Sequence, residues 1–342
     1  MVKWQRDPGA RIQASRDLDS LKLQAPCIVA LPEGGYRLFY TAVGPAKPFP
    51  ECQGYILSAR SGDGVNFQTE PGIRIAPRLE IPHMNRRVLA PSVVRLADGR
   101  WRMYFESRGP ASTPTVIASA ISQDMLSWTL EDGIRFATAG GVGGPRYLPL
   151  PDGGGRLYIF ESAYGPEGLT GKRISMSVIS ASTKDGLNFV RDPGVRMKDR
   201  QGKYDSIGIT AAEVLPPETP GGRWTMIFSA WQDIEPGQMA PVHPSNNAAD
   251  DKSASRNFAA ASIATDLAGY RSRIFAADSA DGLEFGASEC ILEGAGYGTD
   301  GIDAIHAEDM SVVRIGSNRY RMYYAACDRH GKVRIASAVG GR

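Results

Sequence analysis

The sequence SAVGGR at residues 337–342 ends the chain and MVKWQRDPGARI at residues 1–12 begins it. Joined end to start, they form another copy of a motif that also occurs in the interior, in which a serine-rich strand and a turn precede a charged tail. The interior copies are SARSGDGVNFQTEPGIRI from Ser58, SAISQDMLSWTLEDGIRF from Ser119, SASTKDGLNFVRDPGVRM from Ser180 and the looser AADSADGLEF from Ala276. A repeat divided between the termini predicts a ring closed by strands from both ends, which removes open sheet edges.

Each repeat also contains an apolar run and an alternating aromatic segment. The apolar runs are APCIVAL from Ala25, APSVVRL from Ala90, GPRYLPL from Gly144, AAEVLPP from Ala211 and DMSVVRI from Asp309. The aromatic segments are YRLFYTA, WRMYFES, RLYIFES, RWTMIFSA and YRMYYAA. A period of two with many Tyr, Phe and Trp residues is typical of β-strands. Four antiparallel strands repeated five times predict an all-β, five-bladed β-propeller.

The repeat sets the boundaries of this single predicted domain, residues 1–342. Blade 1 covers residues 24–75, blade 2 covers 89–136, blade 3 covers 143–197, blade 4 covers 209–292 with an insertion at 231–270, and blade 5 covers 309–342 plus 1–12. An insertion longer than ~15 residues is typical of a functional loop or of disorder. Its position after the second strand of blade 4 favours a lid over the axial face, with disorder as the alternative.

Composition excludes several function classes. The chain of 342 residues is 22% charged and 42% hydrophobic with a net charge of +2. The chain has no basic run, so its charge gives no reason to propose a nucleic acid or an anionic membrane as partner. No stretch approaches the ~20 apolar residues that span a bilayer. Because the start lacks a signal-peptide core, we expect a cytoplasmic protein. The four cysteines show no metal-ligand spacing, and no metal or other cofactor is predicted.

The repeated Ser, Asp and Gly of the motif, such as Ser61, Asp63 and Gly64, are predicted to build hairpin turns. An aspartate there accepts backbone N–H groups, and glycine adopts a positive φ. Equivalent copies in several repeats cannot all be one active site, so we interpret this motif as structural.

Functional side chains are expected where inner strands begin, because these positions and the loops after the second strands share one face near the axis. The paired carboxylates Glu106 and Glu161 both close an apolar strand, in YFES and IFES. Two carboxylates converging on the axis would raise one pKa and supply an acid beside a base, as glycosidic cleavage requires. The alternative is that each pairs with an arginine, such as Arg87, Arg108 or Arg146, in a structural network.

The segment HAEDM at residues 306–310 places an imidazole and two carboxylates at the start of an inner strand. Strand alternation puts His306 and Glu308 on one side and Asp309 on the other. Acid/base chemistry, hydrogen bonding to a polar ligand, a metal site completed from another blade and a purely structural role remain open for these residues.

The segments GGPRYLPLPDGGGRLYIFESA and YRMYYAACDRHGKVRIASA resemble the five-bladed propeller glycoside hydrolases and phosphorylases, families 32, 43, 62, 68 and 130, and are most similar to the mannoside-phosphorylase-like family 130. The resemblance implies carboxylates that project from inner-strand starts and act on glycosidic bonds. Where these families carry aspartates, this chain has Ala25, Ala90 and Gly144, so the resemblance implies relocated carboxylates. Arg146, which remains from the family's Asp-Pro-Arg pattern, would contact phosphate or sugar.

These observations predict a glycosidase-like enzyme acting on a small-molecule substrate, a sugar or another polyhydroxylated compound, in an axial pocket. Glu213 with Glu308 or Asp309 is the predicted acid/base pair. The predicted substrate-binding residues are Glu106, Glu161, Arg146, His306, Arg87, Asp205 and Trp231. One alternative is a cyclase, lyase or isomerase of specialised metabolism with a non-sugar substrate, and a second is a non-catalytic carbohydrate-binding propeller.

Overall fold

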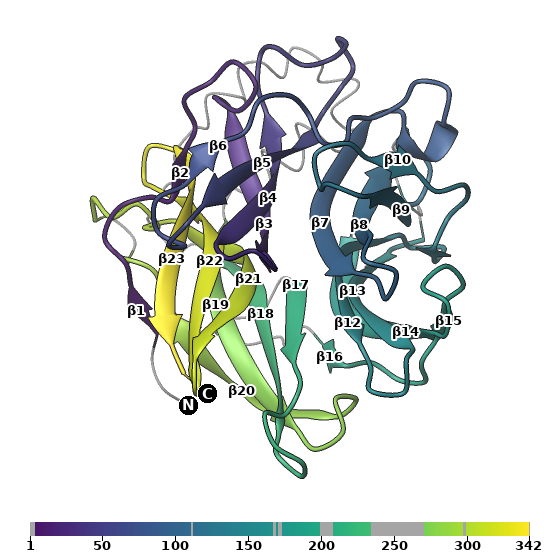
Figure 1. Ribbon diagram of the computed structural model, residues 1–342, viewed down its shortest axis with the longest axis vertical. Helices are drawn as coiled ribbons and strands as arrows, with labels where there is room; N and C mark the ends of the chain where they lie inside the picture. The colour runs from purple at the N-terminus through teal and green to yellow at the C-terminus, as the bar shows by residue number, and fades with distance from the viewer. Residues whose placement is uncertain are drawn as a thin grey trace.

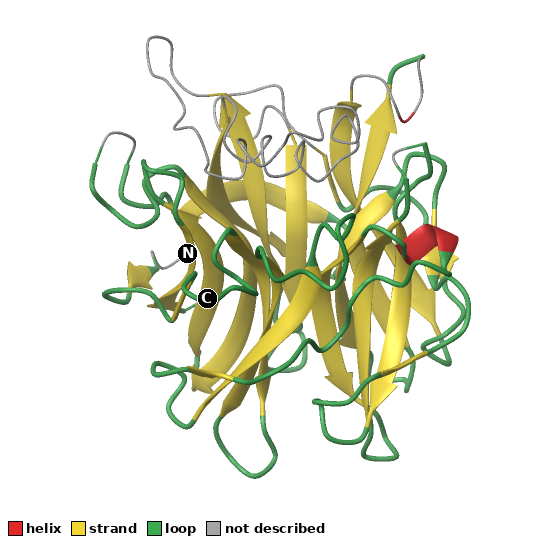
Figure 2. Cartoon of the chain, turned by 90° about the horizontal axis from the view of Figure 1, so that it is seen from above, coloured by secondary structure: helices red, strands yellow, loops and turns green. Residues whose placement is uncertain are grey.

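The computed structural model describes residues 4–110, 112–166, 169, 173–198, 208–233, 270–296 and 299–341. The long strands run side by side through the molecule, and described loops join them at one end (Figure 2). Among the described residues the only named helical element is the short 3₁₀ helix η1 (Pro82–Met84), and no helix is long and apolar enough to cross a membrane. The predicted all-β class is therefore confirmed.

Three sheets hold consecutive antiparallel strands, which we call groups 1 to 3. Group 1 contains β3 (Lys22–Ala30), β4 (Tyr36–Val43), β5 (Tyr55–Ser61) and β6 (Gln68–Thr69). Group 2 contains β7 (Arg87–Arg95), β8 (Trp101–Arg108), β9 (Val116–Ser122), β10 (Thr129–Leu130) and β11 (Phe136–Ala137). Group 3 contains β12 (Val142–Pro149), β13 (Gly155–Tyr164), β14 (Arg173–Thr183), β15 (Val190–Arg191) and β16 (Met197–Lys198).

The fourth sheet joins two further antiparallel groups through one parallel bridge, Ser272 to His306. Group 4 contains β17 (Gly208–Leu215), β18 (Trp224–Asp233), β19 (Tyr270–Ser279) and β20 (Phe285–Leu292). Group 5 contains β21 (His306–Gly316), β22 (Arg319–Cys327) and β23 (Val333–Gly340), together with β1 (Gln5–Arg6) and β2 (Ile12–Gln13) from the start of the chain. The first strands of the five groups contact one another in a cycle, β3, β7, β12, β17, β21 and back to β3, around the centre of Figure 1.

The pairing of the two chain ends keeps the register that the repeat predicts. The Ser337 hydroxyl donates a hydrogen bond to the Asp7 carboxylate at 2.6 Å. The same bond joins Ser58 to Glu70 at 2.6 Å, and these two residues are 12 positions apart; Ser119 with Glu131 and Ser180 with Asp192 repeat the bond and the spacing. Joining residue 342 to residue 1 gives Ser337 and Asp7 the same spacing.

The serine and aspartate of the interior motif form hairpin turns, as predicted. Asp63 accepts the backbone N–H groups of Val65 and Asn66 at 2.8 Å each, and Ser61 accepts that of Gly64 at 2.9 Å. These hydrogen bonds hold the pKa of Asp63 well below its usual range. In the third copy the hydroxyl comes from Thr183 rather than from a serine.

Each of the five first strands contains a β-bulge at a residue in the left-handed backbone region. These bulge residues are Ala25 (φ 49°), Ala90 (φ 50°), Gly144 (φ 56°), Ala211 (φ 42°) and Asp309 (φ 50°). Four of the five are not glycine, and such a backbone costs of order 1 kcal/mol at each. Strain of this kind persists only where the surrounding structure holds it, and it concentrates at functional sites.

Below the bulges, hydrogen bonds connect neighbouring groups around the axis. In one group, the side chain two residues after the bulge accepts a hydrogen bond. The donor is a backbone N–H in the first strand of the next group, three residues after the bulge of that strand. The bonds join Cys27 to Val93 at 3.4 Å, Ser92 to Tyr147 at 2.9 Å, Glu213 to Val312 at 3.1 Å and Ser311 to Ile28 at 3.2 Å. We call these contacts the lower latches. Group 3 has Arg146 at this position. The arginine side chain has no hydrogen-bond acceptor, so it cannot make this contact.

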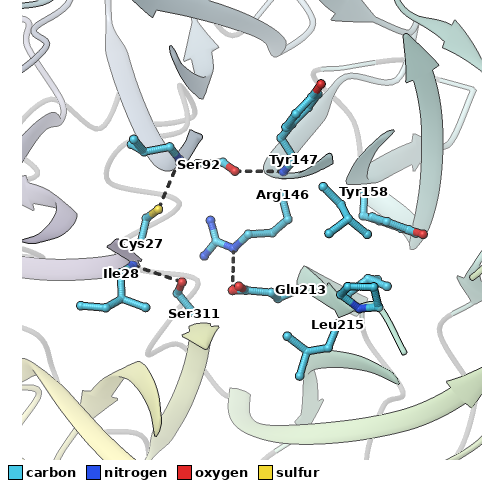
Figure 3. Close-up of a pocket in the computed structure, with 13 residues that line it drawn as sticks. Cys27, Ile28, Ser92, Arg146, Tyr147, Tyr158, Glu213, Leu215 and Ser311 are labelled. Atoms are coloured by element: carbon cyan, nitrogen blue, oxygen red, sulfur yellow. Dashed lines mark hydrogen bonds and ion pairs between the residues drawn. The ribbon is translucent and has the colours of Figure 1, made fainter. Parts of the chain in front are cut away.

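Arg146 instead crosses the axis and connects all the groups (Figure 3). Its Nη1 donates to the carbonyl oxygen of Pro91 at 2.9 Å, and its Nη2 donates to those of Pro26 and Met310 at 3.0 Å each. Its Nε lies 3.6 Å from the Glu213 carboxylate of group 4. The side chain is only 6% exposed. Its guanidinium, which we call the axial plug, therefore uses its donors for contacts within the protein.

We expect removal of residues 1–12 to destabilise the fold strongly, because it exposes the edge of β23 and removes Asp7 from Ser337 and Arg321. The melting temperature should fall by at least about 5 °C, and Asp7→Ala alone should cost about 1–3 kcal/mol of unfolding free energy. Thermal and urea unfolding test this, with Asp98→Ala, which removes an exposed pair with Arg100, as control. An unchanged melting temperature in the truncated chain would contradict the closure.

A second prediction concerns the axial plug. Arg146→Met leaves the partly buried Glu213 carboxylate without its counter-charge and should lower the unfolding free energy by about 3–5 kcal/mol. The same change at the exposed Arg95, which lies over Trp101, should cost about 1 kcal/mol or less. Adding Glu213→Gln to Arg146→Met should recover part of the loss, since it removes the uncompensated charge. Strictly additive losses in urea unfolding would show that the two side chains are not coupled.

Candidate acid and base site on the central axis

A second set of inter-group hydrogen bonds holds the bulges themselves. A side chain on a second strand accepts the backbone N–H of the bulge residue in the following group. Thr41 accepts from Ala90 at 2.9 Å, Glu106 from Gly144 at 3.2 Å and Ser229 from Asp309 at 3.2 Å. We call these contacts the upper latches. Glu106 and Glu213 therefore occupy latch positions at which other groups use Thr, Ser or Cys, and part of their role is structural.

Glu106 lies within a buried ion-pair network. Its carboxylate is 3.2 Å from Arg108 Nη2 and 3.9 Å from Arg87 Nη2, and all three side chains are nearly inaccessible. Gly143 packs directly on it: an added Cβ would lie 2.0 Å from Glu106 Oε2. Only glycine fits at that position without displacing the carboxylate, so a side chain at residue 143 would disturb the ion pairs of Glu106.

The structure does not bring Glu161 to the axis beside Glu106, so the expected convergence of this pair was wrong. Glu106 pairs with Leu89, the residue before a bulge, whereas the equivalent register in group 3 belongs to Phe160. A shift of one residue turns a strand side chain to the opposite face. The Glu161 carboxylate instead accepts two hydrogen bonds of 2.9 Å from Arg191.

Asp309 is the only bulge residue with an ionisable side chain. It is partly exposed, whereas the neighbouring Glu308 is only 4% exposed. Burial of its carboxyl group from bulk water and the nearby Glu308 charge raise the pKa of Asp309 to about 7. The positive charges of Lys22 and Arg146 act in the opposite direction. A carboxyl group with such a pKa can release and recover a proton near neutral pH.

Lys22 completes this charged cluster from the start of β3. Burial lowers the pKa of its ammonium to about 8, while Glu308 and Asp309 favour the charged form. Three groups carry a basic or imidazole side chain three residues before the bulge, namely Lys22, Arg87 and His306. We call these three residues, at the bulge end of the axis, the polar rim. Sequence reasoning missed Lys22, although its spacing from Ala25 matches that of His306 from Asp309.

His306 and Glu308 lie near each other, in agreement with strand alternation. The His306 Nδ1 atom is 4.0 Å from the Glu308 carboxylate and 2.9 Å from the Ser272 hydroxyl on β19. In the described part of the chain, no three His, Cys, Asp or Glu side chains are grouped in a way that would hold a metal ion. Through its contact with Ser272, the imidazole joins groups 4 and 5 at the parallel bridge.

The structure separates Glu213 from Glu308 and Asp309 along the strand direction. Glu213 lies two residues beyond its bulge, at the level of the axial plug, whereas Glu308 and Asp309 lie at the bulge of β21. Burial raises the pKa of Glu213, and Arg146 together with hydrogen bonds from Ser311 and Val312 opposes that rise.

Two predicted site residues cannot be placed as side chains. Asp205 lies outside the described residues, and of Trp231 only the backbone, in β18, is described. Residues 234–269, most of the predicted lid, also lie outside the described part of the chain.

Comparisons with known proteins identify the fold. No family model and no curated protein sequence matches the chain. Among solved structures, a thermostable family-43 glycoside hydrolase has a TM-score of 0.65 at 13% identity, covering 98% of this chain and 91% of that one. A putative glycoside hydrolase from Parabacteroides distasonis has a TM-score of 0.63 at 15% identity, with 98% and 96% covered.

A third similar structure comes from the family 130 of mannoside phosphorylases, which contains glycoside hydrolases that target β-1,2 mannosidic linkages in Candida mannan. It has a TM-score of 0.63 at 16% identity and covers 98% of this chain and 93% of that one. At these identities the likeness establishes the architecture alone. The chain has the propeller fold of the glycoside hydrolases of families 43 and 130, as the sequence resemblance indicated.

Proposed function

We propose that this chain is a glycosidase-like enzyme that acts on a sugar or another polyhydroxylated small molecule at the bulge end of its central axis. The observation that carries the proposal is Asp309, a residue of intermediate exposure at the one ionisable bulge position, whose buried carboxyl group has a pKa of about 7. The scaffold we propose is a five-bladed propeller with the predicted blade boundaries. The cyclic contacts of the five first strands and the pairing of β1 and β2 with β23 support it.

In the proposed reaction, Asp309 is the general acid. It is protonated in much of the protein at neutral pH and can give that proton to the leaving oxygen as the glycosidic C–O bond breaks. A water molecule adds to the anomeric carbon and releases a proton to the solvent, from which Asp309 is protonated again. Glu308 acts through Asp309, because its negative charge disfavours ionisation of the acid. Lys22 limits the effect, so that the proton is not held too tightly to be transferred.

The remaining predicted residues take different places in this proposal. Arg87 and His306 lie at the polar rim, where the hydroxyl groups of a substrate would be bound. Glu106 supplies a fixed negative charge that also raises the pKa of Asp309. We assign Glu213 a structural role as the counter-charge of the axial plug, because its carboxylate lies 3.6 Å from Arg146 Nε and the two charges compensate each other.

One observation favours a second candidate, an enzyme of specialised metabolism that uses the same acid on a non-sugar substrate. Ala25, Leu89 and Ala90 form a buried apolar cluster around the bulges of groups 1 and 2. Apolar groups at the bulge positions of two groups suit a substrate with a hydrocarbon face. Turnover of a broad panel of aryl glycosides by the full chain would support the first candidate, and turnover of none of them would favour the second.

The acid assignment predicts opposite shifts in two variants. Because the protonated form is the active one, kcat/KM should fall as pH rises through about 7. Glu308→Gln removes a repulsive charge, lowers the pKa of Asp309 and should move this limb to lower pH. Lys22→Met removes an attractive charge and should move it to higher pH. A carboxyl ¹³C titration of Asp309 measures the same shifts without a substrate.

Asp309→Asn is the matched test of chemistry, since it keeps the shape of the side chain and abolishes proton transfer. Turnover should fall by about 10²- to 10⁴-fold while substrate binding is retained. Wild-type turnover in Asp309→Asn, or pH shifts of the same sign in Glu308→Gln and Lys22→Met, would overturn the assignment.

The raised pKa also predicts how stability depends on pH. The pKa of Asp309 is about 7 in the folded protein, against about 3.9 for an unfolded aspartate. Between these values the native state binds more protons than the unfolded state, so this residue makes the unfolding free energy fall as pH rises from about 4 to about 7. Asp309→Asn should remove that loss and be more stable than the wild type at pH 8. Urea unfolding at pH 4 and pH 8 measures the difference, and an equal loss in both proteins would contradict it.

A further inference from the structure

A cavity of about 160 Å³ lies beyond the axial plug, on the side away from the bulges. Its polar wall consists of the lower-latch side chains Cys27, Ser92, Glu213 and Ser311 with Arg146, and these residues come from all five groups (Figure 3). Its apolar wall continues along the same strands and includes Ile28, Val93 and Leu215. The candidate acid Asp309 is not among the residues that line it.

The cavity offers hydrogen bonds of both kinds. Ser92 and Cys27 use acceptor sites for neighbouring N–H groups, and a hydroxyl or thiol keeps a hydrogen to donate. The Glu213 carboxylate receives Val312 N–H and lies 3.6 Å from Arg146 Nε on the same oxygen, Oε2, and it also accepts a hydrogen bond from Ser311. Of the roughly four acceptor positions of a carboxylate, one is left for a ligand hydroxyl. A hydroxyl group, which both donates and accepts, matches this wall better than a group that does only one.

The charges of the cavity cancel. Arg146 and Glu213 compensate each other, so the wall attracts neither an anion nor a cation. Burial raises the pKa of the Cys27 thiol to about 11, and burial also raises the pKa values of Tyr147 and Tyr158. These three lining groups are therefore neutral at neutral pH. A charged ligand would lose its hydration here without gaining a partner of opposite charge.

The available volume limits the size of the occupant. A cavity of about 150 Å³ accommodates a molecule the size of benzene, about six non-hydrogen atoms. A carbon skeleton of three or four atoms would lie against Ile28, Val93 and Leu215, with its hydroxyl groups toward Ser92 and Glu213.

We propose that this cavity is a second ligand site, specific for a small neutral polyol of about the size of glycerol and separated from the reaction site by the Arg146 guanidinium. The inference does not depend on the proposed glycosidase function, because it rests on a different set of residues at the other side of the axial plug. Ligands bound there contact the lower latches of several groups at once and stabilise the native ring by mass action.

Binding of three isosteric probes to the full chain tests the proposal: glycerol, lactate as the anion and 3-amino-1,2-propanediol as the cation. Titration calorimetry and ligand-observed NMR should give a millimolar dissociation constant for glycerol, as expected for so few atoms, and at least about tenfold weaker binding of both charged probes. Leu215→Trp fills the apolar side of the cavity and should weaken glycerol binding at least about tenfold.

Leu126→Trp, on an exposed turn residue away from the cavity, is the matched control and should bind glycerol like the wild type. Comparing it with Leu215→Trp separates site binding from the general effect of glycerol on protein hydration. No saturable glycerol binding, equal or tighter binding of a charged probe, or unchanged binding in Leu215→Trp would each overturn the proposal.

Discussion

The Arg146 guanidinium on the central axis is the contact on which the rest of the structure depends. It binds carbonyl groups of Pro26, Pro91 and Met310 and pairs with Glu213. A buried guanidinium with five donors can satisfy several carbonyl groups in one plane, which a hydroxyl or an amide cannot do. One side chain from β12 thereby contacts the first strands of the other four groups, close to their bulges.

Of the four axial carboxylates, Glu106 and Glu213 hold neighbouring groups together, and Asp309, beside Glu308, is the one that we propose for chemistry. Glu106 and Glu213 accept backbone N–H groups of neighbouring groups at positions where hydroxyl or thiol side chains do the same elsewhere. Asp309 differs because the upper latch engages its backbone, through Ser229, while its side chain is partly exposed. A strained bulge that carries an ionisable group costs stability and persists only because its neighbours hold it, which supports the role that we propose for Asp309.

Register explains where prediction from sequence succeeded and where it did not. The repeat read from the sequence aligned the joined termini with the interior copies, and the structure gives Ser337 and Asp7 the same hydrogen bond as Ser58 and Glu70. The likeness of YFES and IFES suggested that Glu161 was equivalent to Glu106, but the two strands differ by one residue in their pairing with the first strand. Because side chains alternate along a strand, that single residue decides between the axis and the outside.

The sequence by itself determined the all-β class, the repeat and the pairing of the chain ends, because strand periodicity and turn chemistry are local properties of the residues. It also placed Asp309 at the start of an inner strand. Only the tertiary structure decided that Arg146 lies across the axis, that Glu213 pairs with it, and that burial, Glu308 and Lys22 together set the pKa of Asp309. Charge interactions depend on distance and burial in space, and residues from β3, β12, β17 and β21 meet only when the ring is assembled.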